Sequence, residues 1–273
     1  MPSPDQRLAG RVAIVTGASR GLGQMCALAL AGEGARLVVS GRSTSESPLR
    51  LPGNVFQTAG MIEERFGAPV LAMPCDVSRP DEVRAMVEAA IERFGRIDII
   101  VNNAAHILPE GEPFADIAPH VFQRMVEVNL MGPFHVLRAA LPKMSAQHFG
   151  NVINISGRSK SRGSPLEATK LALEAMTIGF AGQLRPRGVA VNSLRPVGFI
   201  DTPGMLVNPE VHPRELRPPH SFLEALIRVA MQRADTYSGH VHTDAQALFA
   251  LCDTESFARH RAANAPAWSE GIG

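Results

Sequence analysis

The sequence predicts an α/β protein of a single domain, in which a doubly wound parallel sheet carries helices on both faces. Short runs of aliphatic and β-branched residues alternate with longer segments that have apolar residues at helical spacing. Neighbouring parallel strands need long crossovers, and a helix between each pair of strands supplies them. We find no linker, repeat or low-complexity block that would divide the 273 residues.

The boundaries of the expected elements follow the changes in apolar periodicity and the glycine and proline positions. The expected strands are residues 12–16, 36–40, 70–73, 97–101, 151–155, 189–194 and 237–242. The expected helices are residues 22–33, 55–66, 81–94, 121–144 (interrupted near Gly132 and Pro133), 164–184 and 222–231.

The domain organisation follows from the same pattern. We expect a flexible tail at residues 1–7, one domain at residues 8–250 and a C-terminal tail at residues 251–273. The proline-bearing segment at about 203–234 breaks the strand–helix rhythm after the sixth strand. Ligands of open α/β sheets bind beyond the carboxyl ends of the strands, so this segment is predicted to be a substrate lid.

Composition excludes several classes of function. Lys and Arg number 27 against 26 Asp and Glu, so the net charge of +1 favours neither nucleic acid nor a membrane as a partner. The three cysteines (Cys26, Cys75, Cys252) lie far apart, which suits a reducing compartment and indicates no metal site. The opening MPSPDQR contains no apolar signal segment. We therefore expect a cytoplasmic protein that acts on a small molecule.

The stretch VAIVTGASRGLG at residues 12–23 carries the clearest functional signal. A buried strand leads into a glycine turn and then into a helix, which is the Rossmann-type unit. Gly17, Gly21 and Gly23 remove side chains where backbone N–H groups must approach a phosphate, and the helix dipole favours the negative charge. This stretch predicts a dinucleotide site.

The end of the second strand indicates which dinucleotide is bound. A fold of this kind that prefers NAD usually has Asp or Glu there, to accept a hydrogen bond from the ribose 2′-hydroxyl. Here the position reads Gly41-Arg42-Ser43, and Arg20 lies in the glycine turn. Two guanidinium groups suit a 2′-phosphate, so we expect NADP(H) rather than NAD(H).

Several motifs together resemble the short-chain dehydrogenase/reductase family over roughly residues 8–250. They are TGASRGLG, Cys75-Asp76-Val77, NNAA at 102–105, Asn129 in VNL, Lys170, and Thr202 in DTPG. Three further stretches are similar to the hydroxysteroid-dehydrogenase-like and citronellol-dehydrogenase-like members: LRLPGNVFQTAGMIEERFG, RPVGFIDTPG and SGHVHTDAQAL.

The resemblance implies a role for each matching residue. It places Asp76 at the adenine, Asn103 at the adenosine ribose and Thr202 at the nicotinamide amide. The implied catalytic residues are Asn129, Ser156 and Lys170, and family members are commonly dimers or tetramers that pack through the helices expected at 121–144 and 164–184. The full set of implied cofactor-binding residues is Gly17, Ser19, Arg20, Gly21, Leu22, Gly23, Arg42, Asp76, Val77, Asn103, Ala104, Lys170, Pro196 and Thr202.

The sequence departs from the family at the proton-transfer residues. The family has a tyrosine four residues before the lysine, on the same helix face, but here that position is Leu166. A leucine neither donates nor accepts a proton, and the chain's one tyrosine, Tyr237, lies at the expected last strand. The family's serine aligns with Ser156 or with Gly157, and we take Ser156.

Three functions stay open. The first, which we expect, is an NADP(H)-dependent oxidoreductase of the short-chain type for a carbonyl or alcohol substrate. A water on Lys170 or another side chain would then move the proton; the candidates are His106, Ser156, Ser159, Ser164 and Glu167. The second is an NADP(H)-binding protein without turnover, acting as a regulatory or structural subunit. The third is non-redox chemistry in the pocket that Leu166 leaves.

Two other clusters invite weaker hypotheses. Arg158, Lys160 and Arg162 form a basic loop that would suit an anionic substrate, although such runs are usually only solvated. His240 and His242 alternate along the expected last strand, and an edge strand explains them better than a metal.

Overall fold

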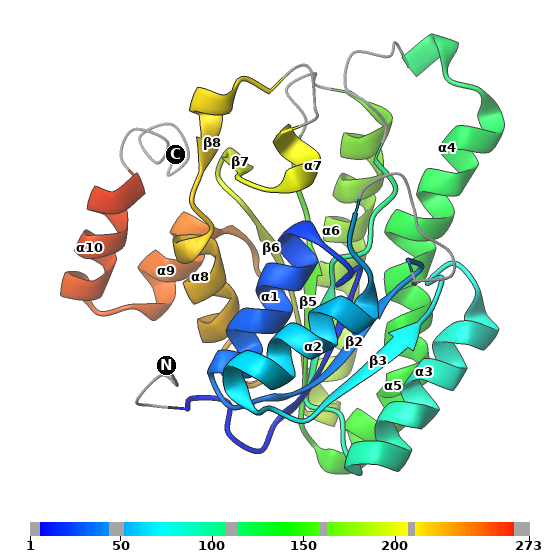
Figure 1. The fold of residues 1–273 in the computed structure, drawn as a ribbon, viewed down its shortest axis with the longest axis vertical. Helices are drawn as coiled ribbons and strands as arrows, with labels where there is room; N and C mark the ends of the chain where they lie inside the picture. The colour runs from blue at the N-terminus through cyan, green and yellow to red at the C-terminus, as the bar shows by residue number, and fades with distance from the viewer. Residues whose placement is uncertain (1–5, 44–51, 108–113, 159–162, 207–210, 265–273) are drawn as a thin grey trace.

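A computed structural model of the chain describes residues 6–43, 52–107, 114–158, 163–206 and 211–264. Its main sheet has seven strands in the order β3-β2-β1-β4-β5-β6-β9, and every neighbouring pair is parallel. The strands are β1 (Val12–Thr16), β2 (Arg36–Gly41), β3 (Val70–Pro74), β4 (Ile99–Asn102), β5 (Gly150–Ile155), β6 (Val189–Arg195) and β9 (Val241–Thr243). This arrangement confirms the predicted doubly wound sheet in a single domain (Figure 1).

Helices cover both faces of the sheet. They are α1 (Gly21–Gly32), α2 (Val55–Phe66), α3 (Pro80–Phe94), α4 (Pro119–Val126), α5 (Gly132–Gln147), α6 (Pro165–Leu184), α7 (Pro203–Leu206), α8 (His220–Ala230), α9 (Asp244–Leu251) and α10 (Thr254–Asn264). A small second sheet pairs β7 (Phe199–Ile200) with β8 (Leu216–Arg217). In Figure 1, β7, β8 and α7 lie together at one end of the molecule, near the start of α1.

The core is split by the sheet into two layers, because successive side chains of a strand point to opposite faces. Ala13 and Val15 of β1 pack with α1, α2, α8 and α9 on one face. Ile14 packs with α3, α5 and α6 on the other. The strands are therefore buried on both faces, which is why they read as continuous apolar runs in the sequence.

Two strands begin two or more residues away from the predicted start. The last strand was predicted at 237–242, but β9 spans Val241–Thr243. Gly239, at φ +90°, turns the chain, and only Val241–Thr243 is in register with β6. The fourth strand begins two residues later than predicted, at Ile99, since Asp98 uses its carboxylate to accept from the backbone N–H of Val12.

The helix predicted at 121–144 is divided as expected, and the break has a defined form. A π-helical turn, Glu127–Met131, joins α4 to α5. It contains Asn129, which is completely buried. The extra residue of a π-turn re-aims side chains locally, so the break positions Asn129 rather than merely ending a helix.

Part of the segment predicted as a lid belongs to the core. Phe222, Leu226 and Val229 of α8 are buried, and the backbone carbonyl of Val229 accepts a hydrogen bond of 2.6 Å from Asn151 in β5. Beyond it, the described part of the expected C-terminal tail, residues 251–264, contains the end of α9 and all of α10. Arg7, placed in the expected N-terminal tail, pairs with Glu33 and Glu224. Specific polar contacts thus hold α8 and Arg7, near the N-terminus, against the rest of the domain.

Candidate functional site

The glycine turn and the end of β4 meet at the point where the strand order reverses. Gly17 has φ +65°, and a Cβ there would lie 2.8 Å from Ala104 Cα. A Cβ on Gly23 would lie 2.3 Å from Gly17 O. The Asn103 amide donates to Thr16 O and Gly17 O at 3.1 and 3.2 Å. The turn is closed so tightly that only glycine fits, and the start of α1 stays open to a phosphate.

Arg20 and Arg42 lie at the end of β2, where the sequence lacks a carboxylate. Arg20 donates through Nη2 to Gly53 O at 2.9 Å, while its buried Nε has no hydrogen-bond partner among the described residues. Burial, together with the positive charge of Arg42, lowers the pKa of Arg20. An unpaired buried guanidinium N–H beside a second cation, next to the buried Ser19, fits an anionic group such as a 2′-phosphate.

Asp76 and Val77 follow β3 at the same edge. Asp76 Oδ1 accepts from the backbone and hydroxyl of Ser78 at 3.0 and 2.7 Å, and Oδ2 accepts from Arg124. Burial raises the pKa of the Asp76 carboxyl, but these bonds outweigh it and the pKa is lowered. Val77 is buried against Gly132 at the start of α5. Asp76 therefore stays an ionised acceptor at the edge of the site.

Thr202 lies across from the glycine turn. Its Cβ is 3.8 Å from the position of a Cβ on Gly21, and its side chain is buried. Thr202 Oγ1 accepts from Met205 N at 3.3 Å, so it caps the short α7. The segment from Pro196 to Thr202 therefore closes the site over the start of α1, and the partly buried Leu22 packs into the core beneath.

Asn129 links the π-turn to the loop after β4. Its Oδ1 accepts from His106 N at 2.7 Å, and its Nδ2 donates to His106 O and Thr169 Oγ1, both at 3.1 Å. These three bonds fix the loop that carries His106. Burial and the charges of Arg42 and Arg124 lower the pKa of His106, so its ring is held neutral. Asn129 thus shapes one wall of the site.

Lys170 is the central ionisable group. The side chain is 6% exposed, and Nζ donates to Ile155 O at 2.7 Å. Burial lowers the pKa of Lys170 to about 8, although the nearby Glu174 carboxylate acts in the opposite direction. An amine with a pKa near 8 exchanges protons readily under ordinary conditions, which is the property required of an acid–base group.

Ser156 points away from the open part of the site. Its hydroxyl donates to Glu174 Oε1 at 2.6 Å and is buried. Arg158 binds the same carboxylate with both Nη1 and Nη2, and Arg195 lies 3.5 Å from it. A Cβ on Gly157 would meet no described atom within 4 Å. Position 157, the alternative alignment, therefore faces free space, whereas Ser156 serves the buried Glu174.

Glu174 is a residue that the sequence reasoning missed. Burial raises the pKa of its carboxyl, but the bonds from Arg158 and Ser156 outweigh it and keep the pKa low. The available signal was its position four residues after Lys170, on the same face of α6. The carboxylate lies beneath the site as a fixed negative charge.

The other proposed proton donors occupy structural positions. Ser164 Oγ accepts from Glu167 N as the N-cap of α6, and Glu167 Oε2 accepts from Gly163 N. Leu166 O accepts from Thr169 Oγ1, which helps to orient Asn129. Ser159, Lys160 and Arg162 lie outside the described residues. The candidates that remain among the described residues are Lys170 and His106.

His240 and His242 belong to an aromatic cluster rather than to a ligand set. Tyr237 Oη and His242 Nδ1 are 2.7 Å apart, and the Tyr237 ring stacks on His240 with centroids 4.1 Å apart. Burial raises the pKa of Tyr237. Within the described ranges, no three His, Cys, Asp or Glu side chains are placed to share a metal ion.

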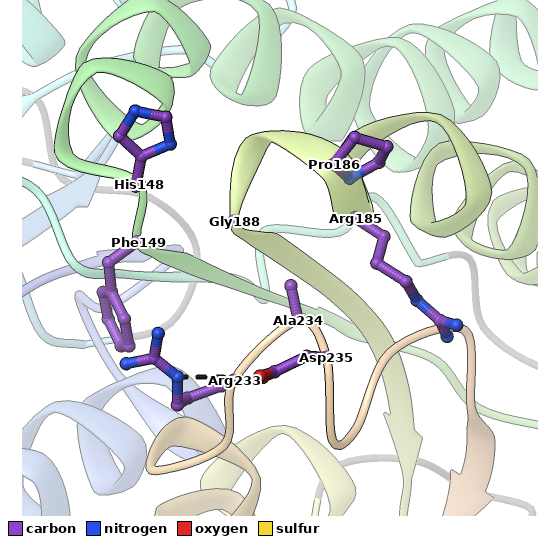
Figure 2. Close-up of a pocket in the computed structure, with 8 residues that line it drawn as sticks. All are labelled: His148, Phe149, Arg185, Pro186, Gly188, Arg233, Ala234 and Asp235. Atoms are coloured by element: carbon purple, nitrogen blue, oxygen red, sulfur yellow. Dashed lines mark ion pairs between the residues drawn. The ribbon is translucent and has the colours of Figure 1, made fainter.

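A separate cavity of about 240 Å³ lies at the amino ends of β5 and β6. His148 and Phe149 form one side and Arg185 another, while Arg233 pairs with Asp235 at 3.7 Å (Figure 2). Ligands of open α/β sheets bind at the carboxyl ends of the strands, so this cavity is not the dinucleotide site.

Fold and site together define an α/β protein with a dinucleotide cradle at the topological switch point. The model of the short chain dehydrogenase family matches residues 11–209, and the chain belongs to this family. It is 36% identical over 200 residues to an uncharacterised oxidoreductase of Staphylococcus saprophyticus, covering 72% of this chain and 81% of that protein.

Solved structures agree with this assignment. A short chain dehydrogenase of Mycobacterium thermoresistibile superposes with a TM-score of 0.78 at 26% identity, covering 89% of this chain and 88% of that one. A metagenomic short-chain oxidoreductase in complex with NADP has a TM-score of 0.69 at 28% identity and covers 87% and 97%. No helix in the described part of the chain is both long and apolar enough to span a bilayer.

Proposed function

We propose that the protein is an NADP(H)-dependent oxidoreductase of the short-chain type that acts on a small carbonyl or alcohol, with Lys170 as its proton-transfer group. The single observation that carries the proposal is the buried Lys170 amine, which donates to Ile155 O at the end of β5 and whose pKa is lowered to about 8 by burial. In the family the lysine acts through a tyrosine, which Leu166 replaces. Here the lysine itself is the ionisable group that we assign to proton transfer.

The cofactor half of the site supports NADP(H). Arg20 and Arg42 would hold the 2′-phosphate, and the N–H groups at the start of α1 would hold the pyrophosphate. The relative bound to NADP has the same fold. When bound, NADP(H) supplies or accepts the hydride.

The chain's own task is to hold the substrate oxygen and move its proton. The Ile155 carbonyl fixes Lys170 Nζ, and the protonated ammonium has three N–H hydrogens, so two remain to reach a substrate oxygen or a bound water. Leu166 presents an apolar wall that excludes competing water. Loss of the family's tyrosine removes an acid–base contribution of roughly 10²–10⁴-fold, so we expect slow turnover.

The test separates binding from chemistry. Titration of NADPH and NADH, followed by nucleotide fluorescence, is expected to show tighter binding of NADPH. Turnover on a panel of aldehydes, ketones and alcohols should then be lost in Lys170→Met with NADPH affinity largely kept. Tighter NADH binding, or unchanged turnover in that variant, would refute the proposal.

A second function, NADP(H) binding without turnover, has an observation of its own in its favour. Leu166 replaces the tyrosine of the family, and the hydroxyl of Ser156, the residue that we align with the family's serine, is bound to Glu174. A protein that binds NADPH, shows no turnover on any substrate of the panel, and gains reductase activity when Leu166 is replaced by tyrosine would fit this function.

We also propose that the chain forms a homo-oligomer, a dimer or tetramer. Leu171 and Ile178 lie seven residues apart on one face of α6 and are 47% and 57% exposed. Met131, in the π-turn, is 38% exposed. Large apolar side chains are commonly exposed in this way where a second subunit packs.

A further inference from the structure

We propose that a buried latch reaching from the C-terminal helix α10 orders the Pro196–Thr202 segment, and that Asn264 and Arg217 are positioning residues for cofactor binding. This inference rests on the proposed NADP(H) site. It is based on a polar network that contains none of the proposed acid–base residues. The network joins the segment at Val197, the Arg217–Asp244 ion pair and α10.

The centre of the latch is the ion pair between Arg217 in β8 and Asp244 in α9. Their side chains are 7% and 0% exposed, and Arg217 Nη2 lies 2.6 Å from Asp244 Oδ2. The pair holds both sides of one residue: Asp244 Oδ1 accepts from Val197 N at 2.8 Å, and Arg217 Nε donates to Val197 O. Val197 directly follows Pro196, so the pair fixes the segment where it leaves β6.

The same arginine also fixes the far end of the segment. Its backbone carbonyl accepts from Asp201 N at 2.9 Å, within the pairing of β7 with β8. Asp201 immediately precedes Thr202, which faces the glycine turn. Arg217 therefore restrains the segment at Val197 and at Asp201, and the position of Thr202 depends on it.

α10 completes the network from outside the site. Asn264 Oδ1 accepts from Arg217 Nη1 at 3.1 Å, and Asn264 Nδ2 donates to Ser221 Oγ at 2.6 Å and to His260 O at 2.8 Å. Asn264 thus satisfies the third nitrogen of a buried guanidinium, which would otherwise be costly to leave unpaired. The side of Asn264 that faces Arg217 acts on the cofactor segment, while the other side fastens α10 to α8.

The two sides can be tested separately. Asn264→Ala removes the contacts with both Arg217 and Ser221, whereas Ser221→Ala removes only the α8–α10 contact and leaves Asn264 Oδ1 in place. The difference between the two variants therefore reports on the Arg217 side. Arg259→Ala, at an exposed ion pair of α10, is the control for the helix itself. The readouts are NADPH affinity and hydrogen exchange of the Val197 and Asp201 amides in the protein without nucleotide.

We expect Asn264→Ala to accelerate exchange at Val197 and Asp201 and to weaken NADPH binding by about fivefold, because a charge-assisted hydrogen bond is lost. Ser221→Ala and Arg259→Ala should change neither readout. Equal effects of Asn264→Ala and Ser221→Ala, or a drop in Tm with unchanged exchange at the two amides, would overturn the latch. The hydrogen exchange is measured without nucleotide, so it tests the latch independently of the cofactor. If the unmodified protein does not bind NADPH, the proposed function is refuted, while the exchange rates still decide whether the latch orders the segment.

Discussion

Ser156 donates its hydroxyl hydrogen to Glu174 across 2.6 Å, and this bond turns the hydroxyl toward α6. At the next position, Gly157, a Cβ would meet no described atom within 4 Å. Lys170, one turn before Glu174 on α6, binds the preceding carbonyl, Ile155 O. Ile155, the last residue of β5, and Ser156, which follows it, thus bind the two buried charged groups of α6.

The first prediction concerns pH. The pKa of Lys170 is lowered to about 8 by burial, so the amine is protonated below that pH and neutral above it. Carbonyl reduction needs a proton donor, and kcat/KM for reduction should fall as the pH rises through about 8. Alcohol oxidation needs a base and should rise through the same pH. Profiles of both directions check this, and a profile without a transition near pH 8 would exclude Lys170 as the proton-transfer group.

The second prediction concerns Glu174, whose negative charge raises the pKa of Lys170. Glu174→Gln removes the charge and keeps the shape, so the midpoint of the pH profile should move to lower pH. Because Ser156 and Arg158 lose a charged acceptor, the free energy of unfolding should fall by about 1–3 kcal/mol. Glu167→Gln, in the first turn of α6, where Glu167 Oε2 accepts from Gly163 N, is the control and should leave the midpoint in place.

The third prediction restores the tyrosine hydroxyl at position 166 and adds a hydroxyl at position 157, the alternative position for the family's serine. Leu166→Tyr combined with Gly157→Ser should raise kcat/KM for NADPH-dependent reduction by roughly 10²–10⁴-fold, the usual contribution of acid–base catalysis. A side chain at 157 has free space among the described residues. Leu166→Phe with Gly157→Ala supplies the same bulk without hydroxyls and should give no gain. A gain in this control would show that shape, rather than proton transfer, limits the rate.

Some of these relationships could be predicted from the sequence and others could not. The alternation of strands and helices follows from local apolar periodicity, and the parallel sheet follows from the length of the crossovers. The loss of the tyrosine at Leu166 follows from a fixed four-residue spacing. The partner of Ser156 could not be predicted, since Glu174 is 18 residues away and meets it only after α6 packs on β5. The same holds for Arg217 and Asp244, 27 residues apart. Periodicity also misplaced the last strand, because a left-handed Gly239 redirects the chain.

The fourth prediction tests the choice of nucleotide. Arg42 is exposed, so Arg42→Ala is expected to leave the fold intact. It should weaken NADPH binding by about ten- to hundredfold, the loss expected for charge-assisted bonds to a phosphate, and leave NADH binding nearly unchanged. Arg65→Ala, at an exposed site on α2, is the control for net charge. Equal losses for both nucleotides would show that Arg42 does not contact a 2′-phosphate.

The fifth prediction concerns the exposed face of α6. Ile178→Glu places a charge on the exposed face of α6 that also carries Leu171 and Ala175. A second subunit that packs there would have to bury this charge without a partner, so the oligomer should dissociate. Light scattering should then give a smaller mass with unchanged circular dichroism. Phe56→Glu, at a position 48% exposed on α2, makes the same chemical change on a different face and should leave the mass unchanged. If the α2 variant dissociates and the α6 variant does not, the subunit contact lies at α2, which would contradict this prediction.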